Sequence, residues 1–166
     1  MDEVVYRRAR AADVPRITEI YNTVIVDSHV SFDGEPQTVD QRRAWFEGLS
    51  AEGPHQAWVA EAGGRVVGVA YSSPWKPKTG YAGTVETTIV FEPAATGRGL
   101  GRGLMEHLLD AVREAGAEQA IAVVALPNDP SIRFHHALGY RTVGVLEDVG
   151  TKLGRRWSTE ILQKEL

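Results

Sequence analysis

Hydrophobic side chains recur every three or four residues in three stretches of this chain, which is the spacing of one face of an α-helix. Asp13 is placed to cap the first helix, with Pro15 in its first turn. The second helix is expected to begin at Thr38, where the sequence TVDQ has the form of a capping box, and the third to close at Gly116 in the left-handed conformation. The repeating residues are Ile17, Ile20, Tyr21 and Val24, then Trp45, Phe46 and Leu49, then Leu104, Leu108, Leu109 and Val112.

The segments between these helices have the composition of β-strands. Strands are predicted over residues 4–9, 84–91, 141–149 and 157–163, and the stretch 57–71 is expected to form two strands joined by a tight turn at Gly63 and Gly64. Residues 120–126 form a continuous apolar run, which is typical of a strand buried on both faces. A short fourth helix is expected to have Asp129 as its cap, Pro130 at its first position and Gly139 at its end.

This order of elements predicts an α/β fold, a mixed sheet of six to seven strands with helices on both faces. The 166 residues, 43% of them hydrophobic, suit one domain over residues 1–166 with a single core. The net charge of -4 argues against non-specific binding to nucleic acid, and the lack of cysteine excludes disulfides, thiolate ligands and a cysteine nucleophile. No apolar run is long enough to span a bilayer, so we expect a cytoplasmic protein with no membrane partner.

Four glycines alternate with other residues ahead of the third helical pattern. They are Gly97, Gly99, Gly101 and Gly103, with Arg98 and Arg102 among them. The spacing fits neither a dinucleotide-binding fingerprint nor a P-loop. It fits R-x-x-G-x-G between a strand and a helix, where bare backbone and the unpaired N–H groups of a first helical turn would suit a pyrophosphate. Taken alone, the stretch is equally compatible with a flexible turn whose arginines are solvated.

The segment from Arg98 to Gly103 resembles the acetyl-CoA pyrophosphate loop of the GNAT N-acetyltransferases, and the resemblance extends over nearly the whole chain. Further blocks are similar to the phosphinothricin and methionine sulfone (methionine sulfoximine) acetyltransferase branch: EPQT at Glu35, PWK at Pro74, TVE at Thr84 and LPNDPSIRFHHALGY at Leu126. This resemblance implies a strongly twisted sheet that splays after its fourth strand, so that the pantetheine arm of the coenzyme lies in the gap. It also implies a homodimer with acceptor pockets near the interface.

The resemblance implies that acetyl-CoA is the cosubstrate and that no metal is needed. The residues implied in its binding are Arg98, Gly99, Leu100, Gly101, Arg102 and Gly103 for the pyrophosphate, and Ile89, Val90, Phe91, Asn128 and Ser131 along the pantetheine arm. The backbone of residues 89–91 would bind that arm as a strand does, and could polarise the acetyl carbonyl. From the sequence alone, Asn128 is equally typical of a turn.

Two side chains are candidates for acid–base chemistry. Glu86 is a carboxylate in an otherwise uncharged strand, so a central position would raise its pKa, whereas an edge position would leave it merely solvated. In the resembling family the glutamate of TVE is proposed to take the proton from the incoming amine. His135 stands five residues before Tyr140, where many GNAT enzymes have a tyrosine, and we assign it a catalytic role while placing His136 on the surface.

The acceptor pocket is implied by segments similar to those of the same branch, with Phe32, Lys76, Lys78, Tyr81 and Thr84 as its candidate residues. The carboxylate of a small amino acid would need a cation there, and lysine stands at position 78 where the family commonly has arginine, which grips a carboxylate with two parallel donors. Trp157 lies one residue further from Gly154 than in the family pattern, so that its side chain would change face unless a bulge absorbs the shift. Thr159 replaces an aspartate of that pattern.

The reaction we expect is direct transfer in a ternary complex, in which the amine of a small amino acid attacks the thioester of acetyl-CoA. Two alternatives remain: an acetyltransferase for another amine, such as a protein N-terminus or a polyamine, and a non-catalytic acetyl-CoA sensor. Hydrolase and metalloprotease motifs are missing, and the five histidines show no ligand spacing with carboxylates.

Overall fold

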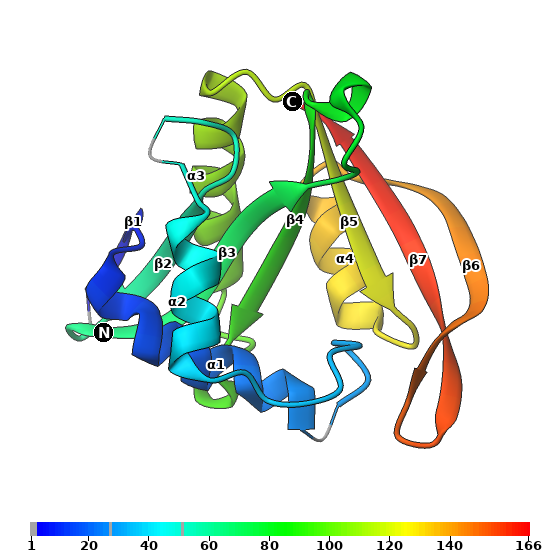
Figure 1. The fold of residues 1–166 in the computed structure, drawn as a ribbon, viewed down its shortest axis with the longest axis horizontal. Helices are drawn as coiled ribbons and strands as arrows, with labels where there is room; N and C mark the ends of the chain where they lie inside the picture. The colour runs from blue at the N-terminus through cyan, green and yellow to red at the C-terminus, as the bar shows by residue number, and fades with distance from the viewer. Residues whose placement is uncertain (1–2, 27, 51) are drawn as a thin grey trace.

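The computed structural model describes residues 3–26, 28–50 and 52–166, and within them seven strands form one twisted sheet (Figure 1). The sheet order is β1-β2-β3-β4-β5-β7-β6, and every neighbouring pair of these strands is antiparallel except β4 and β5. The strands are β1 (Val4–Arg8), β2 (Ala57–Ala62), β3 (Arg65–Pro74), β4 (Thr84–Phe91), β5 (Gln119–Ala125), β6 (Arg141–Lys152) and β7 (Arg155–Glu165). The helices are α1 (Val14–Val26), α2 (Val39–Glu47), α3 (Leu100–Glu114) and α4 (Asp129–Ala137), and the 3-10 turns are η1 (Ala11–Asp13), η2 (Thr79–Tyr81) and η3 (Pro93–Ala95).

The helices cover both faces of the sheet, as the sequence predicts. On one face α1 and α2 pack over β2 and β3, with Ile17, Ile20, Val59 and Val69 fully buried between them. On the other face α3 packs over β2 and β3, and α4 lies beside β5. The larger of the two cores is on this second side, because the helical repeat of α3 buries one continuous apolar stripe.

The sheet opens between β4 and β5, which confirms the predicted splay. These parallel strands pair only from Thr84 to Glu86 on β4, opposite Gln119 to Ile121 on β5. Beyond Glu86 the two strands diverge, and Figure 1 shows the gap between the green arrow of β4 and the yellow-green arrow of β5. The backbone of β4 from residue 87 onward is therefore paired with β3 alone among the described strands.

Several predicted helix ends are confirmed. Thr38 and Gln41 form the capping box of α2, in which the Thr38 hydroxyl accepts from the Gln41 N–H and the Gln41 side chain accepts from the Thr38 N–H. Gly116 and Gly139 follow α3 and α4 with φ of +94° and +87°. Gly63 and Gly64 also have positive φ, as the tight turn between β2 and β3 requires.

Three predicted boundaries are wrong. Asp13 does not cap α1, because Arg10 occupies the N-cap of the preceding turn η1 and its backbone N–H donates to Asp13 Oδ2 at 2.7 Å. The cap of α4 is Asn128 rather than Asp129, since the Asn128 side chain accepts from the backbone N–H of Ser131. Helix α3 begins at Leu100, one turn earlier than its apolar repeat predicts, because tertiary contacts compensate for the low helix propensity of its glycines.

The prediction that residues 120–126 are buried on both faces holds for β5 except at Val123, since Ile121 and Ala125 on the face opposite Ala120 are only 7% and 6% exposed. Ala120, Ala122 and Val124 are buried in the core under α3 and α4. Val123 on the opposite face is 39% exposed and lines the opening beside β4. An apolar run predicts burial in general, but it carries no information on whether a neighbouring strand or a ligand cleft lies beside it.

Candidate active site

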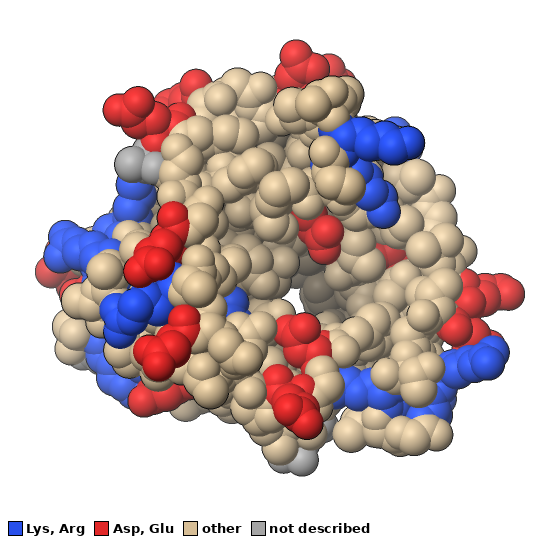
Figure 2. Space-filling view, in the orientation of Figure 1, with Lys and Arg blue, Asp and Glu red and all other residues tan. Residues whose placement is uncertain are grey.

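A cavity of about 820 Å³ occupies the opening between β4 and β5. Residues of α1 such as Tyr21 and Val24 line it from one side of the sheet, whereas Leu100 of α3 and Phe134 of α4 line it from the other. The cavity therefore crosses the sheet through its splay, and Figure 2 shows the hollow at the centre of the molecule. Two reactants can enter such a cavity from opposite faces and meet where β4 and β5 come together.

The start of α3 forms one end of this cavity. Gly97 and Gly99 both have φ of +78°, a conformation that favours glycine, and Gly99 is the residue before the first helical turn. Leu100, Gly101 and Arg102 form that turn and line the cavity, so its unpaired N–H groups and the positive end of the helix dipole are available to an anion. This is the geometry the sequence predicts for a pyrophosphate, although Gly101 and Gly103 lie inside the helix and only Gly97 and Gly99 precede it.

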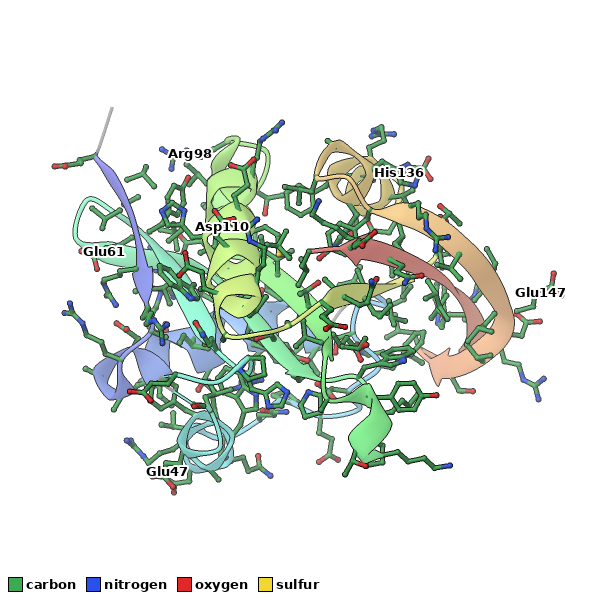
Figure 3. The ribbon with its side chains drawn as sticks, turned by 90° about the horizontal axis from the view of Figure 1, so that it is seen from above. Glu47, Glu61, Arg98, Asp110, His136 and Glu147 are labelled. Carbon is green, nitrogen blue, oxygen red and sulfur yellow. The ribbon has the colours of Figure 1, made fainter. Side chains whose placement is uncertain are left out.

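The other two predicted members of this loop have different surroundings. Arg98 is exposed just before the start of α3 (Figure 3) and does not line the cavity. Gly103 faces away from the cavity toward β1, and a Cβ built on it would lie 2.5 Å from the ring of Tyr6. Gly103 therefore lets α3 approach β1 closely, and the sequence pattern by itself does not separate this packing role from ligand binding.

The free edge of β4 forms the wall next to α3. Ile89, Val90 and Phe91 all line the cavity. Because β5 has already diverged at this point, N–H and C=O groups on this edge of β4 are available to an extended ligand. Gly101 also lines this wall, and a Cβ on it would come within 3.1 Å of Phe134, so glycine keeps the passage between α3 and α4 open.

Glu86 lies at the point where β4 and β5 separate, and its side chain is half-buried in the cavity wall. Burial raises the pKa of Glu86 above its ordinary value of 4.5, and the positive charge of Lys76 partly opposes this shift. Of the two positions that the sequence allows for Glu86, the structure has the central, partly desolvated one and not the solvated edge. A carboxylate with a raised pKa is a better base near neutral pH.

His135 lines the same cavity from α4 and is only 4% exposed. Its Nδ1–H donates to the backbone carbonyl of Ser131 at 2.8 Å, and the ring packs edge-on against Phe134 and Tyr140 at centroid distances of 5.2 and 5.1 Å. Burial lowers the pKa of His135, so the neutral ring prevails at neutral pH and its Nε2 carries no proton. His136 is exposed on the outer side of α4, which confirms its predicted surface position (Figure 3).

Asn128 and Ser131 line the cavity at the start of α4. The side-chain oxygen of Asn128 is engaged as the helix cap at 3.3 Å from the Ser131 nitrogen, which leaves its amide group able to donate to a ligand. The turn and ligand interpretations of Asn128 are therefore compatible, because they use different atoms of one side chain.

Of the five predicted acceptor residues, the cavity contains only Phe32. Thr84 is the first residue of β4, and Lys78 and Tyr81 are exposed beside or within η2. Lys76 is exposed with its ammonium over the ring of Trp75, yet close enough to influence Glu86. Lys76, Lys78 and Tyr81 thus lie on the segment that connects β3 to β4, and Thr84 opens β4 near the end that carries Glu86.

Sequence reasoning missed a set of contacts beside the part of the cavity wall that Val30, Ser31 and Phe32 form. We call it the hairpin clamp, because it joins residues 28–33 to the β6–β7 hairpin. The ring of His29 stacks on Trp157 at 4.2 Å, the ammonium of Lys152 donates to the Ser31 carbonyl, and the ring of Phe32 lies against the backbone of Gly150. Only Gly150 carried a signal, since an isolated glycine within a strand often marks a close approach.

The shifted tryptophan is one member of this clamp. The register of β6 against β7 shifts between Leu146 and Gly150, where β6 has two extra residues, whereas β7 continues regularly from Trp157 to Thr159. The side chain of Trp157 stacks on His29, and its Nε1 donates to the Lys152 carbonyl at 2.8 Å. This bulge lies on β6 and not beside the additional residue of β7, so the change of face of Trp157 stays a prediction.

Two further properties concern the described residues only. Residues 3–26, 28–50 and 52–166 contain no group of three or more His, Cys, Asp or Glu side chains placed to hold a metal ion. Within the same ranges, each helix is too short or too polar to cross a membrane.

Comparisons with known proteins match this geometry. The sequence profile described as acetyltransferase (GNAT) family matches residues 17–140. A phosphinothricin N-acetyltransferase of Streptomyces coelicolor is 36% identical over 99% of this chain and 97% of its own length. An L-methionine sulfoximine/L-methionine sulfone acetyltransferase of Salmonella typhimurium is 34% identical over 96% of this chain and 93% of its own length. Among solved structures, a phosphinothricin acetyltransferase of Sinorhizobium meliloti in complex with acetyl-CoA superimposes with a TM-score of 0.93 and 31% identity, covering 98% of this chain and 88% of that one.

Proposed function

The chain belongs to the acetyltransferase (GNAT) family and is an acetyl-CoA-dependent N-acetyltransferase, and we propose that its acceptor is the amine of a small amino acid of the phosphinothricin or methionine sulfone type. One observation carries the proposal. A single cavity joins the first turn of α3, the free edge of β4 and the carboxylate of Glu86. A thioester whose diphosphate is held at α3 would lie along β4 and point toward Glu86.

In the proposed reaction Glu86 accepts a proton from the ammonium form of the acceptor, directly or through water, because most aliphatic amines are protonated near pH 7. The freed nitrogen attacks the thioester carbonyl to form a tetrahedral intermediate. The C–S bond then breaks, the coenzyme leaves as its thiolate, the acetyl group stays on nitrogen, and the second proton that this nitrogen loses passes to the thiolate or to water. Holding both reactants in one cavity supplies roughly 7 to 11 kcal/mol, against about 3 to 5 kcal/mol from proton transfer, so positioning dominates.

The state of His135 restricts its role. A neutral ring whose Nδ1–H is engaged by Ser131 has no proton on Nε2, so it is not arranged to protonate the leaving thiolate at neutral pH. It can accept a hydrogen bond from the incoming amine or from a water molecule that links this amine to Glu86. We therefore assign His135 to holding the amine, and Glu86 to taking its proton.

An activity assay with a panel of acceptor amines tests this proposal. We expect release of free coenzyme A thiol from acetyl-CoA with phosphinothricin, methionine sulfone or methionine sulfoximine, and little release with polyamines or with peptides that present a free N-terminus. Faster turnover on peptides or polyamines would instead identify an acetyltransferase for protein N-termini or polyamines. Tight coenzyme binding without turnover on any amine would favour the non-catalytic sensor.

The hairpin clamp gives a sharper test of where the acceptor binds. A methyl group on Gly150 would collide with the ring of Phe32, which lines the cavity and would have to move. Gly150→Ala is expected to lower kcat/KM for the acceptor by up to about 10²-fold, since a displacement of roughly 1 Å in a positioning residue has effects of this size. The KM for acetyl-CoA should not change, and steady-state kinetics with each substrate varied in turn separates the two constants.

The matched control is Gly144→Ala, which lies on the same strand and has no atom within 4 Å of the added methyl group. Equal acceptor kinetics in the two variants would show that Phe32 does not shape the acceptor pocket.

We further propose a homodimer and a single N-acetyltransferase domain over residues 1–166. The support for one domain is the continuous sheet, and the support for a dimer is the row of exposed Val143, Val145, Leu146, Val149 and Leu153 on the edge strand β6 and its turn. Such an apolar edge is commonly covered by a partner. The cytoplasmic location remains a prediction.

A further inference from the structure

A buried cation lies outside the reaction cavity. Arg42 of α2 is 3% exposed, and no carboxylate of the described residues forms an ion pair with it. Its Nε and Nη2 atoms are buried and have no hydrogen-bond partner. Burying an unpaired charge is costly, and buried arginines are almost always paired. This arginine therefore calls for a partner that the chain itself does not supply.

Two aromatic rings hold the guanidinium in place. The Cζ atom of Arg42 lies 4.0 Å from the ring centroid of Tyr21 and 4.8 Å from that of Trp45. Such cation–π contacts offset part of the desolvation of the charge. They engage the flat face of the guanidinium, so they leave its N–H groups, which point outward in the plane, without acceptors.

A second cavity of about 310 Å³ adjoins this arginine. Its wall consists of Tyr21, Gln37, Gln41, Arg42, Trp45 and Tyr71. The side-chain amide of Gln37 forms no hydrogen bond with the described residues, and Gln41 uses only its oxygen, in the capping box. The cavity thus combines one cation and two amide groups able to donate with the apolar surface of three aromatic rings.

This second cavity is separate from the reaction cavity but close to it. Tyr71 on β3 pairs with Thr88 on β4, and Thr88 lines the reaction cavity from the face that carries α1 and α2. Tyr21 belongs to both walls and donates from its hydroxyl to Asp33 at 2.8 Å. An occupant of the second cavity would therefore contact a residue that also shapes the first.

We propose that the second cavity is a binding site for a short monocarboxylate, with the carboxylate on Arg42 and the apolar tail against Trp45 and Tyr71. A planar carboxylate matches the planar fork of an arginine whose face is already stacked. Arg42 is the one cation in the wall, which suits a single negative charge better than the double charge of a phosphate. The aromatic surface favours a ligand with an apolar tail over an inorganic anion.

The tryptophans make the site observable. The chain has four of them, and Trp45 is the one in this wall. The test is a titration of the full-length protein, saturated with coenzyme A, with propionate, followed by the four indole N–H signals in ¹H–¹⁵N NMR spectra. Coenzyme A occupies only its own side of the reaction cavity, so propionate that binds on the acceptor side is recognised by a shift of the Trp157 signal, in the hairpin clamp, instead of the Trp45 signal. Propionate is expected to shift the Trp45 signal saturably while the other three stay in place, and propionamide, its uncharged isostere, should leave all four unchanged.

Variants assign the effect to the proposed groups. Arg42→Met should weaken propionate binding about tenfold or more, and Gln37→Leu, at a half-buried position, roughly 2- to 10-fold. A Trp45 signal that does not move with propionate, that moves equally with propionamide, or that responds unchanged in Arg42→Met would overturn the proposal. If Arg42→Met does not fold, the paired titrations of the wild-type protein and Gln37→Leu decide it. Turnover on amines is not a readout here, so the result is independent of the proposed acceptor.

Discussion

Glu86→Gln is expected to lower kcat by about 10²- to 10⁴-fold, the usual contribution of a general base, while leaving the affinity for acetyl-CoA unchanged. The substitution keeps the size of the side chain and removes only the group that accepts the proton. Binding of acetyl-CoA depends instead on the start of α3 and the edge of β4, which the substitution does not touch. Stopped-flow or steady-state kinetics with a fixed acceptor, together with calorimetric titration of coenzyme A, measures the two quantities separately.

The pH dependence of the same pair identifies the titrating group. Burial raises the pKa of Glu86, so the wild-type enzyme should lose kcat/KM on acidification at a pH above that of an ordinary glutamate, and this limb should be missing in Glu86→Gln. The pKa of Glu86 is higher in the folded protein than in the unfolded chain. Its ionisation therefore costs stability as the pH rises from the unfolded pKa to the folded pKa. Glu86→Gln should therefore be at least as stable as wild type at neutral pH. Wild-type turnover in this variant across neutral pH would remove Glu86 from the mechanism.

Gly103→Ala is expected to destabilise the protein, although glycine within a helix is ordinarily the weaker residue. Helix propensity alone predicts a gain of about 1 kcal/mol. The added methyl group would lie 2.5 to 2.8 Å from three atoms of the Tyr6 side chain, two in its ring and the hydroxyl oxygen. That ring is held by its hydroxyl, which donates to the Leu100 carbonyl, and by contact with His107, so relief requires α3 or β1 to shift. Overpacking of this kind costs about 1 to 3 kcal/mol, which is enough to reverse the sign.

Thermal unfolding measures this prediction, with a decrease in Tm of about 2 to 4 °C per kcal/mol for a chain of this size. The second variant, Tyr6→Leu, removes the obstructing ring atoms. In a double-mutant cycle, Gly103→Ala should be less harmful, or even stabilising, in the Tyr6→Leu background. An equal change in Tm from Gly103→Ala in both backgrounds would contradict the packing role and favour a role of Gly103 in ligand binding.

The amino-acid sequence by itself determined the elements that depend on local interactions. The capping box at Thr38, the turn at Gly63 and Gly64, and the terminating Gly116 and Gly139 were all predicted, because each depends on a few neighbouring residues and on the φ angles that glycine permits. Similarity of separated sequence blocks to a known family also predicted the splay after β4, which short-range pattern alone does not contain.

The same reasoning misplaced boundaries where two local solutions compete. Asn128 and Asp129 are both good cap residues, and only the path of the chain into α4 selects Asn128. The four glycines predicted a bare ligand loop, whereas two of them lie inside α3 and make room for other side chains, Phe134 beside Gly101 and Tyr6 beside Gly103. A glycine in the sequence indicates that some group approaches the backbone closely, but it does not identify that group.

Tertiary structure alone decided the contacts between residues distant in the sequence. His29 and Trp157 are stacked, and Lys152 reaches Ser31, because the splay lets the β6–β7 hairpin meet residues 28–33. The tertiary structure also buries Arg42 beside two aromatic rings with no carboxylate paired to it among the described residues, although α2 looks like an ordinary amphipathic helix in the sequence. Local patterns fix backbone conformation within a few residues, whereas burial, pKa and pairing depend on which surfaces the folded sheet brings together.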